Sequence, residues 1–461
     1  MKVKNLKETI DFKKFAKFSK PGPRYTSYPT AVEFNQDYTY DSYIQDLQKD
    51  TNPLSLYVHL PFCRSACYFC GCNVIYTSKE ENKTLYLEIL KKELQILKNT
   101  LDCTKEVCQL HFGGGTPTFF HAKELEVLIQ MLKETFPNFH NDAEIACEID
   151  PRFFNKEQMQ VLKNGGFNRL SFGIQDFNPK VQEAIHRIQP FSLVQDAISI
   201  ARDFGISSIN FDLIYGLPYQ TLETFQETLS QCLKLNPDRF AVFNYAHVPW
   251  IKKTMRKIDE TTLPIPEEKL NILKSTIQHL QENGYKMIGM DHFAKPDDEL
   301  FKSIQKGQLR RNFQGYSTKG GTQTIGIGLT SIGEGMDYYA QNHKDLPSYK
   351  KAIDLGILPF SKGIKLSLDD RIRKSVIMQL MSNFKLDFSA IEKQFNINFK
   401  EYFSESLKEL EIFAVENLIT IHNNGIEVSP TGTLLIRNIV MAFDAYIKKF
   451  SPNQKIFSKT I

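Results

Sequence analysis

Two kinds of hydrophobic pattern alternate along the first 300 residues of the chain. Short runs rich in apolar and β-branched residues predict buried strands, and longer runs with apolar residues every three or four positions predict amphipathic helices, as at 83–99 and 123–136. The predicted strands are "LSLYVHLPF" (54–62), "VCQLHF" (107–112), "EIACEID" (144–150), "RLSFGIQ" (169–175), "INFDLIYG" (209–216), "RFAVFNYAH" (239–247) and "KMIGMDHF" (286–293).

This alternation predicts six to seven βα units. Strands that alternate with helices form parallel sheets joined by crossover connections. Eight such units close a barrel, so a smaller number leaves it open along one side. We therefore expect an α/β fold, an incomplete (β/α)6-type barrel, which admits a wider substrate than a closed barrel.

The two ends of the chain have other patterns. "PGPRYTSYP" (21–29) is rich in turn formers, and helical runs after residue 366 lead into "LITIHNNGIEVSP", where Asn424-Gly425 predicts a hairpin. We predict four parts: an N-terminal arm (1–50), the partial barrel (51–300), a connecting segment (301–365) and a mostly helical C-terminal domain (366–461).

Composition and charge are those of an ordinary globular protein. The chain has 461 residues and a formal net charge of only +4, and the C-terminal segment lacks the dense basic stripe of a winged DNA-binding domain. The opening "MKVKNLKETIDFKKF" has no apolar core typical of a signal peptide, and no run approaches the roughly 18 apolar residues of a membrane span. We expect a soluble, cytoplasmic protein with reduced thiols.

"CRSACYFCGC" (63–72) holds four of the eight cysteines and needs a chemical explanation. A disulfide knot belongs to short secreted chains. Structural zinc usually needs a second pair of ligands, and the other cysteines form none: Cys103, Cys108, Cys147 and Cys232. Thiolates also hold iron–sulfur clusters, and C-x-x-x-C-x-x-C supplies three, which leaves one iron of a cubane open to another molecule.

Further polar groups and glycines follow the predicted strands at their carboxyl ends, where βα barrels keep their active sites. They are Gly113 to Thr116 after the second strand, Glu148 and Asp150 at the third, Gln175 at the fourth, Asp212 in the fifth and Asn244 to His247 at the sixth. Each has a structural alternative, since glycines turn the chain, carboxylates cap helices, and Arg187 could be a solvated helix residue. The common rim makes structural zinc a poor explanation.

The cysteine spacing resembles the signature of radical S-adenosylmethionine (SAM) enzymes. Longer motifs resemble one family of them, the oxygen-independent coproporphyrinogen III oxidases of heme synthesis. These motifs are "PGPRYTSYPTA", "LYVHLPFCRSACYFCGC", "HFGGGTPT", "EIDPR", "NRLSFGIQDFN", "DLIYGLPYQT", "DRFAVFNYAHVP", "GMDHFAKPDDEL" and "RNFQGYST". The resemblance extends from about residue 20 to "LLIRNIVMAFDAY".

The resemblance implies site residues by position. Cys63, Cys67 and Cys70 match the ligands of a [4Fe–4S] cluster, and Cys72 matches a fourth cysteine, not a ligand, that is characteristic of the oxidases. The positions that match SAM contacts, with two SAM used per substrate, are Tyr57, Phe69, Gly114, Gly115, Thr116, Glu148, Gln175, Arg187, Asp212, Ala246 and Ile332. In the family the arm folds over the barrel mouth, and we interpret the C-terminal domain as a cover for the substrate cavity.

The implied activity is oxidative decarboxylation of two propionates of coproporphyrinogen III to vinyl groups, which gives protoporphyrinogen IX. We expect a low-potential electron donor such as flavodoxin or ferredoxin, a monomer, and no binding to nucleic acid. Since the substrate carries four propionates, we also predict that Arg24 handles substrate. The alternative is the related heme-binding chaperone, whose members typically lack the residue matching Cys72 and the "PRYTSYPT" arm, and this chain has both.

Overall fold

The structure is a computed structural model that describes residues 17–18, 20–449 and 457. Its contacts divide the chain into two compact units, each assembled from separate stretches of sequence. The barrel unit comprises Phe34–Asn283 and Gly321–Lys365, and the terminal unit comprises Met1–Glu33, Gly284–Gly320 and Leu366–Ile461. Residues 1–16 of the predicted arm lie outside the described residues, and the division into four parts stays a prediction.

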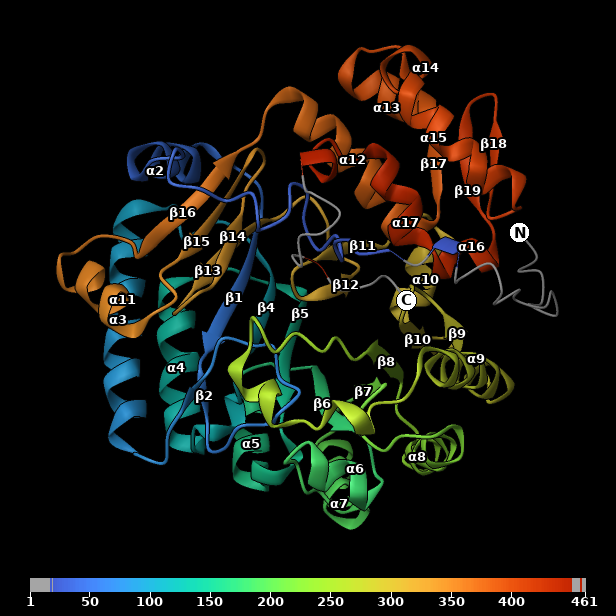
Figure 1. The fold of residues 1–461 in the computed structure, drawn as a ribbon. Coiled ribbons are helices and arrows are strands. Elements are labelled where there is room, and N and C mark those ends of the chain that lie inside the picture. Colours follow the sequence, from blue (N-terminus) through green and yellow to red (C-terminus); the bar gives the residue numbers. More distant parts are fainter. Residues whose placement is uncertain (1–16, 19, 450–456, 458–461) are drawn as a thin grey trace. The chain divides into compact units, whose positions relative to one another are not determined.

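A sheet of parallel strands forms the core of the barrel unit (Figure 1). Six strands are parallel neighbours in the order β1-β4-β5-β6-β7-β8. Their bounds are Leu54–Leu60, Val107–Gly114, Phe139–Ile149, Arg169–Gln175, Ser208–Tyr215 and Arg239–Asn244. Short strands β2 (Phe62–Cys63) and β3 (Ile75–Tyr76) pair beside them.

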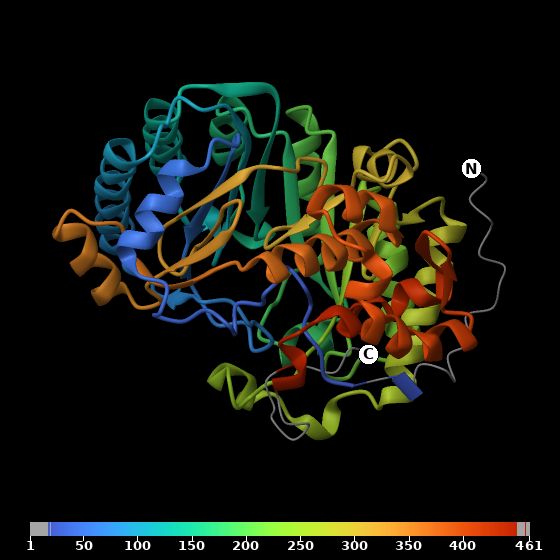
Figure 2. The same ribbon diagram turned by 90° about the horizontal axis from the view of Figure 1, so that it is seen from above.

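Each of the six strands is followed by a helix, and these helices cover the outer face of the sheet (Figures 1 and 2). They are α3 (Glu81–Thr100), α4 (Ala122–Thr135), α5 (Lys156–Asn164), α6 (Pro179–Ala184) with α7 (Phe191–Asp203), α8 (Leu222–Lys234) and α9 (Pro266–Glu282). Four 3-10 turns also belong to this unit: η1 (Pro117–Phe119), η2 (Pro151–Phe153), η3 (Lys253–Lys257) and η4 (Glu260–Thr262). The six βα units predicted from the sequence are confirmed.

Strands from the later part of the chain extend the sheet beyond β1. Strand β13 (Gln323–Ile327) pairs in parallel with β1, and β14 (Ile332–Glu334), β15 (Tyr338–Asn342) and β16 (Phe360–Lys365) follow as antiparallel neighbours. Helices α2 (Tyr40–Lys49) and α11 (Leu346–Asp354) complete the unit. The strand order is open, so the expected incomplete barrel is confirmed.

The single strand predicted at 286–293 is interrupted in the structure. The segment forms an antiparallel pair, β9 (Lys286–Met287) and β10 (His292–Ala294), in the terminal unit. The chain turns between them, and the Ile288 amide donates to the His292 carbonyl at 2.9 Å. Ile288 and Phe293 are both buried, so a small hairpin produced the apolar pattern of a strand.

The remaining elements of the terminal unit are short, apart from helix α12 (Leu368–Asn383). They are α10 (Glu299–Gln305), β11 (Arg310–Asn312), β12 (Gly315–Ser317), β17 (Lys385–Asp387), α13 (Phe388–Phe395), α14 (Phe399–Tyr402), α15 (Ser404–Val415), β18 (Ile419–His422), β19 (Gly425–Val428), α16 (Pro430–Leu434), α17 (Ile436–Val440), η5 (Met441–Phe443) and η6 (Ile447–Lys449). Strands β18 and β19 are antiparallel, which confirms the predicted hairpin; its two-residue loop is 423–424.

Burial alternates along the strands that carry the candidate residues. In β6, Leu170, Phe172 and Ile174 are buried while the residues between them are half-buried, and β7 has the same pattern. Successive side chains of a strand point to opposite faces, so one face packs under the helices and the other is polar. The polar face of the sheet is therefore where Asp212 and Gln175 lie.

Glu93 joins helix α3 to the late strands of the barrel unit and to helix α11. Its buried carboxylate accepts hydrogen bonds from the Gly328 amide at 2.9 Å, from the Asn342 amide at 3.1 Å and from the Tyr349 hydroxyl. Burial, which outweighs these hydrogen bonds, raises the pKa of Glu93 to about 7. The folded unit therefore binds this proton more tightly than the unfolded chain does.

We predict a pH-dependent stability from this group. Between its ordinary pKa of 4.5 and about 7, the free energy of unfolding should fall as pH rises, because the unfolded chain releases the proton first. Glu93→Gln imitates the protonated form, so from pH 5 to pH 8 the variant should gain about 1–3 kcal/mol relative to the native protein. Urea unfolding at several pH values measures this. Glu88→Gln, on the exposed side of the same helix, is the control, and parallel curves for Glu93→Gln and the native protein would contradict the prediction.

Candidate active site

The cysteine loop begins where β1 ends and is tied down at several points. The Cys63 carbonyl accepts from the Thr77 amide at 3.0 Å, and the Cys67 carbonyl accepts from the Cys70 amide at 3.2 Å. The Tyr68 amide donates to the Ile185 carbonyl at 3.0 Å, which joins the loop to the residue after α6. The backbone of this loop is therefore held in place without any cofactor.

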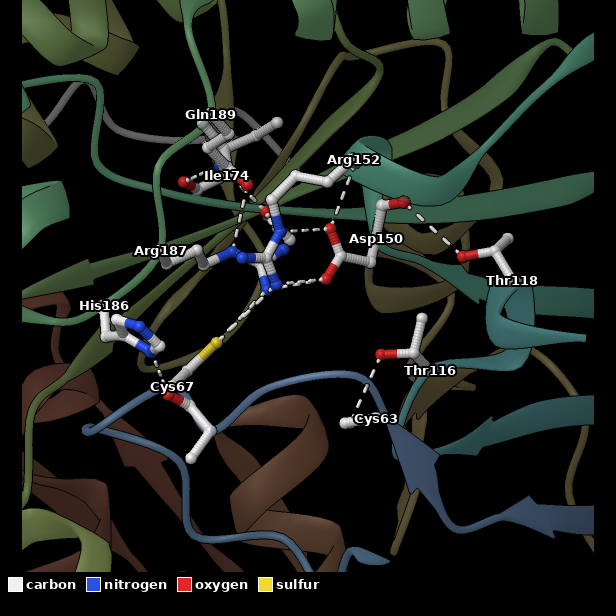
Figure 3. A network of polar contacts seen from close by, with 12 residues as sticks. Cys63, Cys67, Thr116, Thr118, Asp150, Arg152, Ile174, His186, Arg187 and Gln189 are labelled. Carbon is white, nitrogen blue, oxygen red and sulfur yellow. Dashed lines mark hydrogen bonds and ion pairs between the residues drawn. The ribbon is translucent and has the colours of Figure 1, made fainter. Parts of the chain in front are cut away.

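Two arginines lie against the buried thiol of Cys67 (Figure 3). Arg187 Nη1 lies 3.7 Å and Arg152 Nη2 lies 3.8 Å from Cys67 Sγ. N–H groups directed at a sulfur can hydrogen-bond it when it serves as a cluster ligand. The surroundings of Cys67 thus suit a ligand to iron.

The other thiols of the loop have different surroundings. Cys63 Sγ lies 3.4 Å from Thr116 Oγ1; burial first, and then the neighbouring Cys70 and Cys67, raise the pKa of Cys63 to about 12. A hydrogen bond from the Cys72 thiol, aided by Lys252 and Arg187, lowers the pKa of Cys70 to about 6. Cys72 is exposed, and its carbonyl accepts from Lys252 Nζ at 2.9 Å.

These donors fit an iron–sulfur cluster. Cys70 and Cys67 both raise the pKa of Cys63, so the three thiols lie close together, and the sulfurs of Cys67 and Cys70 accept hydrogen bonds. Among the described residues, no group of three or more His, Cys, Asp and Glu side chains is arranged to hold a metal ion. A cubane differs from a lone ion, because irons and sulfides separate its thiolate ligands.

Glu148, at the end of β5, lies against the glycine loop that follows β4. Its carboxylate accepts from the Gly114 amide at 3.2 Å and lies 3.1 Å from His111 Nε2. Burial raises its pKa, but these two hydrogen bonds outweigh the effect and hold the pKa of Glu148 below its usual value. Gly114 has a φ of +113°, and a Cβ there would lie 2.6 Å from the His59 ring, so only glycine fits.

Asp150 is the centre of a buried charged network (Figure 3). Its Oδ2 accepts from Arg152 Nη2 at 2.7 Å and Arg187 Nη1 at 3.1 Å, and its Oδ1 accepts from Arg152 Nε at 3.0 Å. Burial opposes the charged form, but the two arginines prevail and lower the pKa of Asp150. Arg187 also donates to Gln189 Oε1 at 3.0 Å and to the Gly173 carbonyl at 2.8 Å. It is therefore not the solvated helix residue of the alternative interpretation.

The remaining predicted SAM contacts are all in the barrel unit. Asp212 accepts from Ser171 at 2.7 Å and from Asn210 at 2.8 Å, and Gln175 ends β6 with a φ of 66°. Phe69 packs at the edge of an apolar cluster that contains Ile185 and Leu217. The others are half-buried: Tyr57 in β1, Ala246 after β8 and Ile332 at the start of β14. Their contact with SAM stays a prediction.

Sequence reasoning missed four residues of the candidate active site: His59, His111, Arg152 and Gln189. Tyr57 Oη lies 3.1 Å from His59 Nδ1, and the rings of Tyr57 and His111 stack at 5.9 Å. The strand pattern offered a signal, because His59 is two residues after Tyr57 and so shares its face, and β4 sets His111 opposite Tyr57. No comparable signal existed for Gln189, which follows a helix.

Comparison with known proteins agrees with this geometry. The Radical SAM superfamily domain matches residues 57–232, and the HemN C-terminal domain matches residues 366–435. The chain is 60% identical to an oxygen-independent coproporphyrinogen III oxidase of Helicobacter pylori, with 98% of this chain and 100% of that protein covered. The oxidase of the same name from Escherichia coli is 46% identical, with 96% and 97% covered. The solved structure described as coproporphyrinogen III oxidase (HemN) from Escherichia coli, a radical SAM enzyme, has a TM-score of 0.89, with 46% identity and 92% of this chain and 97% of that chain covered.

The open βα barrel, the three-thiol loop and the domain match define a radical SAM enzyme, with its [4Fe–4S] cluster and SAM as cofactors. The sequence identity over nearly the whole chain shows to which family of radical SAM enzymes the chain belongs. The chain belongs to the family of oxygen-independent coproporphyrinogen III oxidases. Among the described residues, no helix is long and apolar enough to cross a bilayer.

Cys67→Ser should yield colourless protein. Serine is a poor ligand for iron, because iron–sulfur clusters are held by soft thiolates. Iron and sulfide analysis after anaerobic reconstitution should fall from about four of each per chain to near zero. Cys108→Ser is the matched control, because Cys108 lies outside the loop, and it should keep the cluster. A brown Cys67→Ser protein that cleaves SAM would contradict the assignment.

Proposed function

We propose that this chain oxidatively decarboxylates two propionate side chains of coproporphyrinogen III to vinyl groups and so makes protoporphyrinogen IX. The observation that carries the proposal is the 60% identity to an oxidase of this name over 98% of the chain, which includes the cysteine loop, the polar rim and the terminal unit. The related heme-binding chaperone is not favoured, since Cys72 and the "PRYTSYPT" arm are both present.

When bound, the cluster would supply the electron that cleaves SAM, and the cleaved SAM would remove a hydrogen atom from the substrate. The chain's part is to bind and orient. Cys63, Cys67 and Cys70 would hold the cluster. Glu148 presents a carboxylate to ribose hydroxyls or an ammonium group, and the glycine loop lets the backbone approach closely.

The direct test is anaerobic turnover of the reconstituted protein with coproporphyrinogen III, SAM and a chemical reductant. The product should be protoporphyrinogen IX, identified as protoporphyrin after oxidation, together with 5′-deoxyadenosine and methionine. Production of 5′-deoxyadenosine with an unchanged tetrapyrrole would leave the radical SAM assignment in place and refute this substrate.

We also propose a low-potential electron donor such as flavodoxin or ferredoxin, a monomeric state, use of two SAM molecules per substrate, and a cytoplasmic location. An exposed Cys72 and seven further free cysteines are typical of a protein kept in a reducing compartment, which supports the location. The role of Cys72 is proposed to lie with the substrate and not with the cluster.

We propose that Arg187 contributes to SAM binding. Arg187→Ala should weaken the binding of SAM by about 1.5–3 kcal/mol, because a charge-assisted contact is lost, while the cluster survives. Calorimetry with SAM and iron analysis measure the two effects separately. Arg152→Gln is the comparison, because Arg152 also contacts Cys67 and Asp150. Unchanged SAM affinity in Arg187→Ala would refute the role, and loss of iron instead would make Arg187 a support for Cys67.

We propose that Arg24 handles a propionate of the substrate. Within the terminal unit its Nη2 donates to Asp291 Oδ2 at 2.6 Å, and 42% of its side chain remains exposed. Arg437 supports the preceding residues by donating to the carbonyls of Gly22 and Pro23. A paired, partly exposed guanidinium on a supported backbone can exchange one carboxylate for another.

Arg24→Ala should keep the cluster and the uncoupled cleavage of SAM but lose decarboxylation. The reason is that the substrate loses a bidentate cation, whereas neither cofactor contacts this residue in the proposal. Arg24→Lys should restore turnover only in part, since an ammonium lacks the planar fork. Product yield at low substrate concentration is the measurement, and full turnover by the alanine variant would show that this charge is unimportant.

A further inference from the structure

Arg152 of the barrel unit contacts the thiol of Cys67, and the proposed function gives it no part. It lies in the 3-10 turn η2 directly after β5, and only 14% of its side chain is exposed. Its Nη2 lies 3.8 Å from Cys67 Sγ and donates to it (Figure 3). A nearly buried cation that donates to the sulfur of a cluster ligand is placed to act on the cluster itself.

Asp150 holds the guanidinium of Arg152 along one edge. Nε donates to Asp150 Oδ1 at 3.0 Å and Nη2 donates to Asp150 Oδ2 at 2.7 Å, which is the two-point pairing of a planar guanidinium with a carboxylate. Nη2 carries two hydrogens, and the carboxylate takes the one on the edge that Nη2 shares with Nε. The other hydrogen, on the opposite edge, serves the sulfur of Cys67. Arg152 therefore satisfies both partners at once.

The backbone and the ring beside Arg152 fix its position further. The Arg152 amide donates to Asp150 Oδ1 at 3.1 Å, so the same carboxylate also caps the turn η2. The guanidinium carbon lies 5.3 Å from the centre of the Phe153 ring, and Thr118 Oγ1 donates to the Asp150 carbonyl at 3.4 Å. Burial opposes the charged form, but the hydrogen bond and the charge of Asp150 prevail and raise the pKa of Arg152. The side chain therefore stays a cation in a fixed place.

Arg187 also donates to Cys67 Sγ, at 3.7 Å, but its other contacts differ. Its Nε donates to Gln189 Oε1 and its Nη2 donates to the Gly173 carbonyl, so it ties β6 to the segment after α6. The side-chain hydrogen bonds of Arg152 go to Asp150 and Cys67. Because SAM binding is proposed for Arg187 and not for Arg152, a change at Arg152 tests the contact with the sulfur by itself.

We propose that Arg152 is a positioning residue that raises the reduction potential of the cluster by acting through the sulfur of Cys67. Hydrogen bonds to ligand sulfurs and nearby charge set the potentials of iron–sulfur clusters. A reduced cluster carries one more negative charge than an oxidised one, so a fixed cation and its N–H group favour the reduced form. The electron itself comes from the donor. This inference rests on the proposed role of Cys67 as a ligand, and not on the proposed substrate.

The test is a redox titration of the reconstituted full-length protein without SAM, with the reduced cluster measured by electron paramagnetic resonance. Arg152→Gln removes the charge. Its equilibrium constant for one-electron reduction should fall about threefold or more, which moves the midpoint about 30 mV or more to negative potential, since tenfold corresponds to about 59 mV. Arg202→Gln is the matched control, because Arg202 Nη2 pairs with Asp238 Oδ2 at 2.8 Å in the same unit and its other side-chain hydrogen bonds go to backbone carbonyls. Its midpoint should equal that of the native protein.

The outcomes separate this inference from the proposed function, because neither SAM nor a tetrapyrrole is present in the titration. A native midpoint in Arg152→Gln, with iron and sulfide retained, overturns the inference and leaves the function intact. If Arg152→Gln does not keep the cluster, Arg152→Lys decides: an ammonium keeps the charge but cannot reach both oxygens of Asp150 and the sulfur together, so its midpoint should also lie below the native one. A native midpoint in that variant, or loss of the cluster in both variants, would mean that Arg152 only supports the loop and would overturn the inference.

Discussion

The buried carboxylate of Asp150 is the interaction on which the active site depends. It pairs with two arginines in the interior of the barrel unit, and both arginines lie beside the thiol of Cys67. None of these charges could remain buried alone, because the loss of hydration would exceed any gain from packing. Together they form a network of one carboxylate and two guanidinium groups, and both guanidinium groups contact the thiol. The same two arginines thus pair with the buried acid and donate to the sulfur of Cys67.

The residues at the rim of the sheet also hold one another in place. The register of β4 and β5 brings Glu148 under the glycine loop, where the Gly114 amide and His111 hold it in the charged form. A side chain at Gly113 would lie 2.7 Å from the Glu148 carboxylate, so the small residues and the acid depend on each other. Backbone amides, a histidine and glycines together make a polar surface that is ready before any cofactor binds.

Charged side chains connect separate stretches of the chain in the terminal unit. Its arginines are brought together from three distant stretches of the chain, and Arg437 holds the backbone just before Arg24. Asp291 accepts from Arg24 at 2.6 Å and lies 2.6 Å from His292, so this carboxylate joins the N-terminal stretch to the β9–β10 hairpin.

Local patterns in the sequence were enough to predict six βα units, the open barrel, the cysteine loop and the rim on which the candidate residues lie. Strand and helix periodicities are properties of short segments, and the carboxyl ends of parallel strands must share one edge. The pattern did not reveal the turn inside 286–293, because a short hairpin and a single strand have the same run of apolar residues. Only the tertiary structure decided that Asp150 pairs with Arg152 and Arg187, and that Arg311 is buried with open donors. The contact of Arg187 joins residues far apart in the chain, and all of these facts depend on burial, which no local pattern encodes.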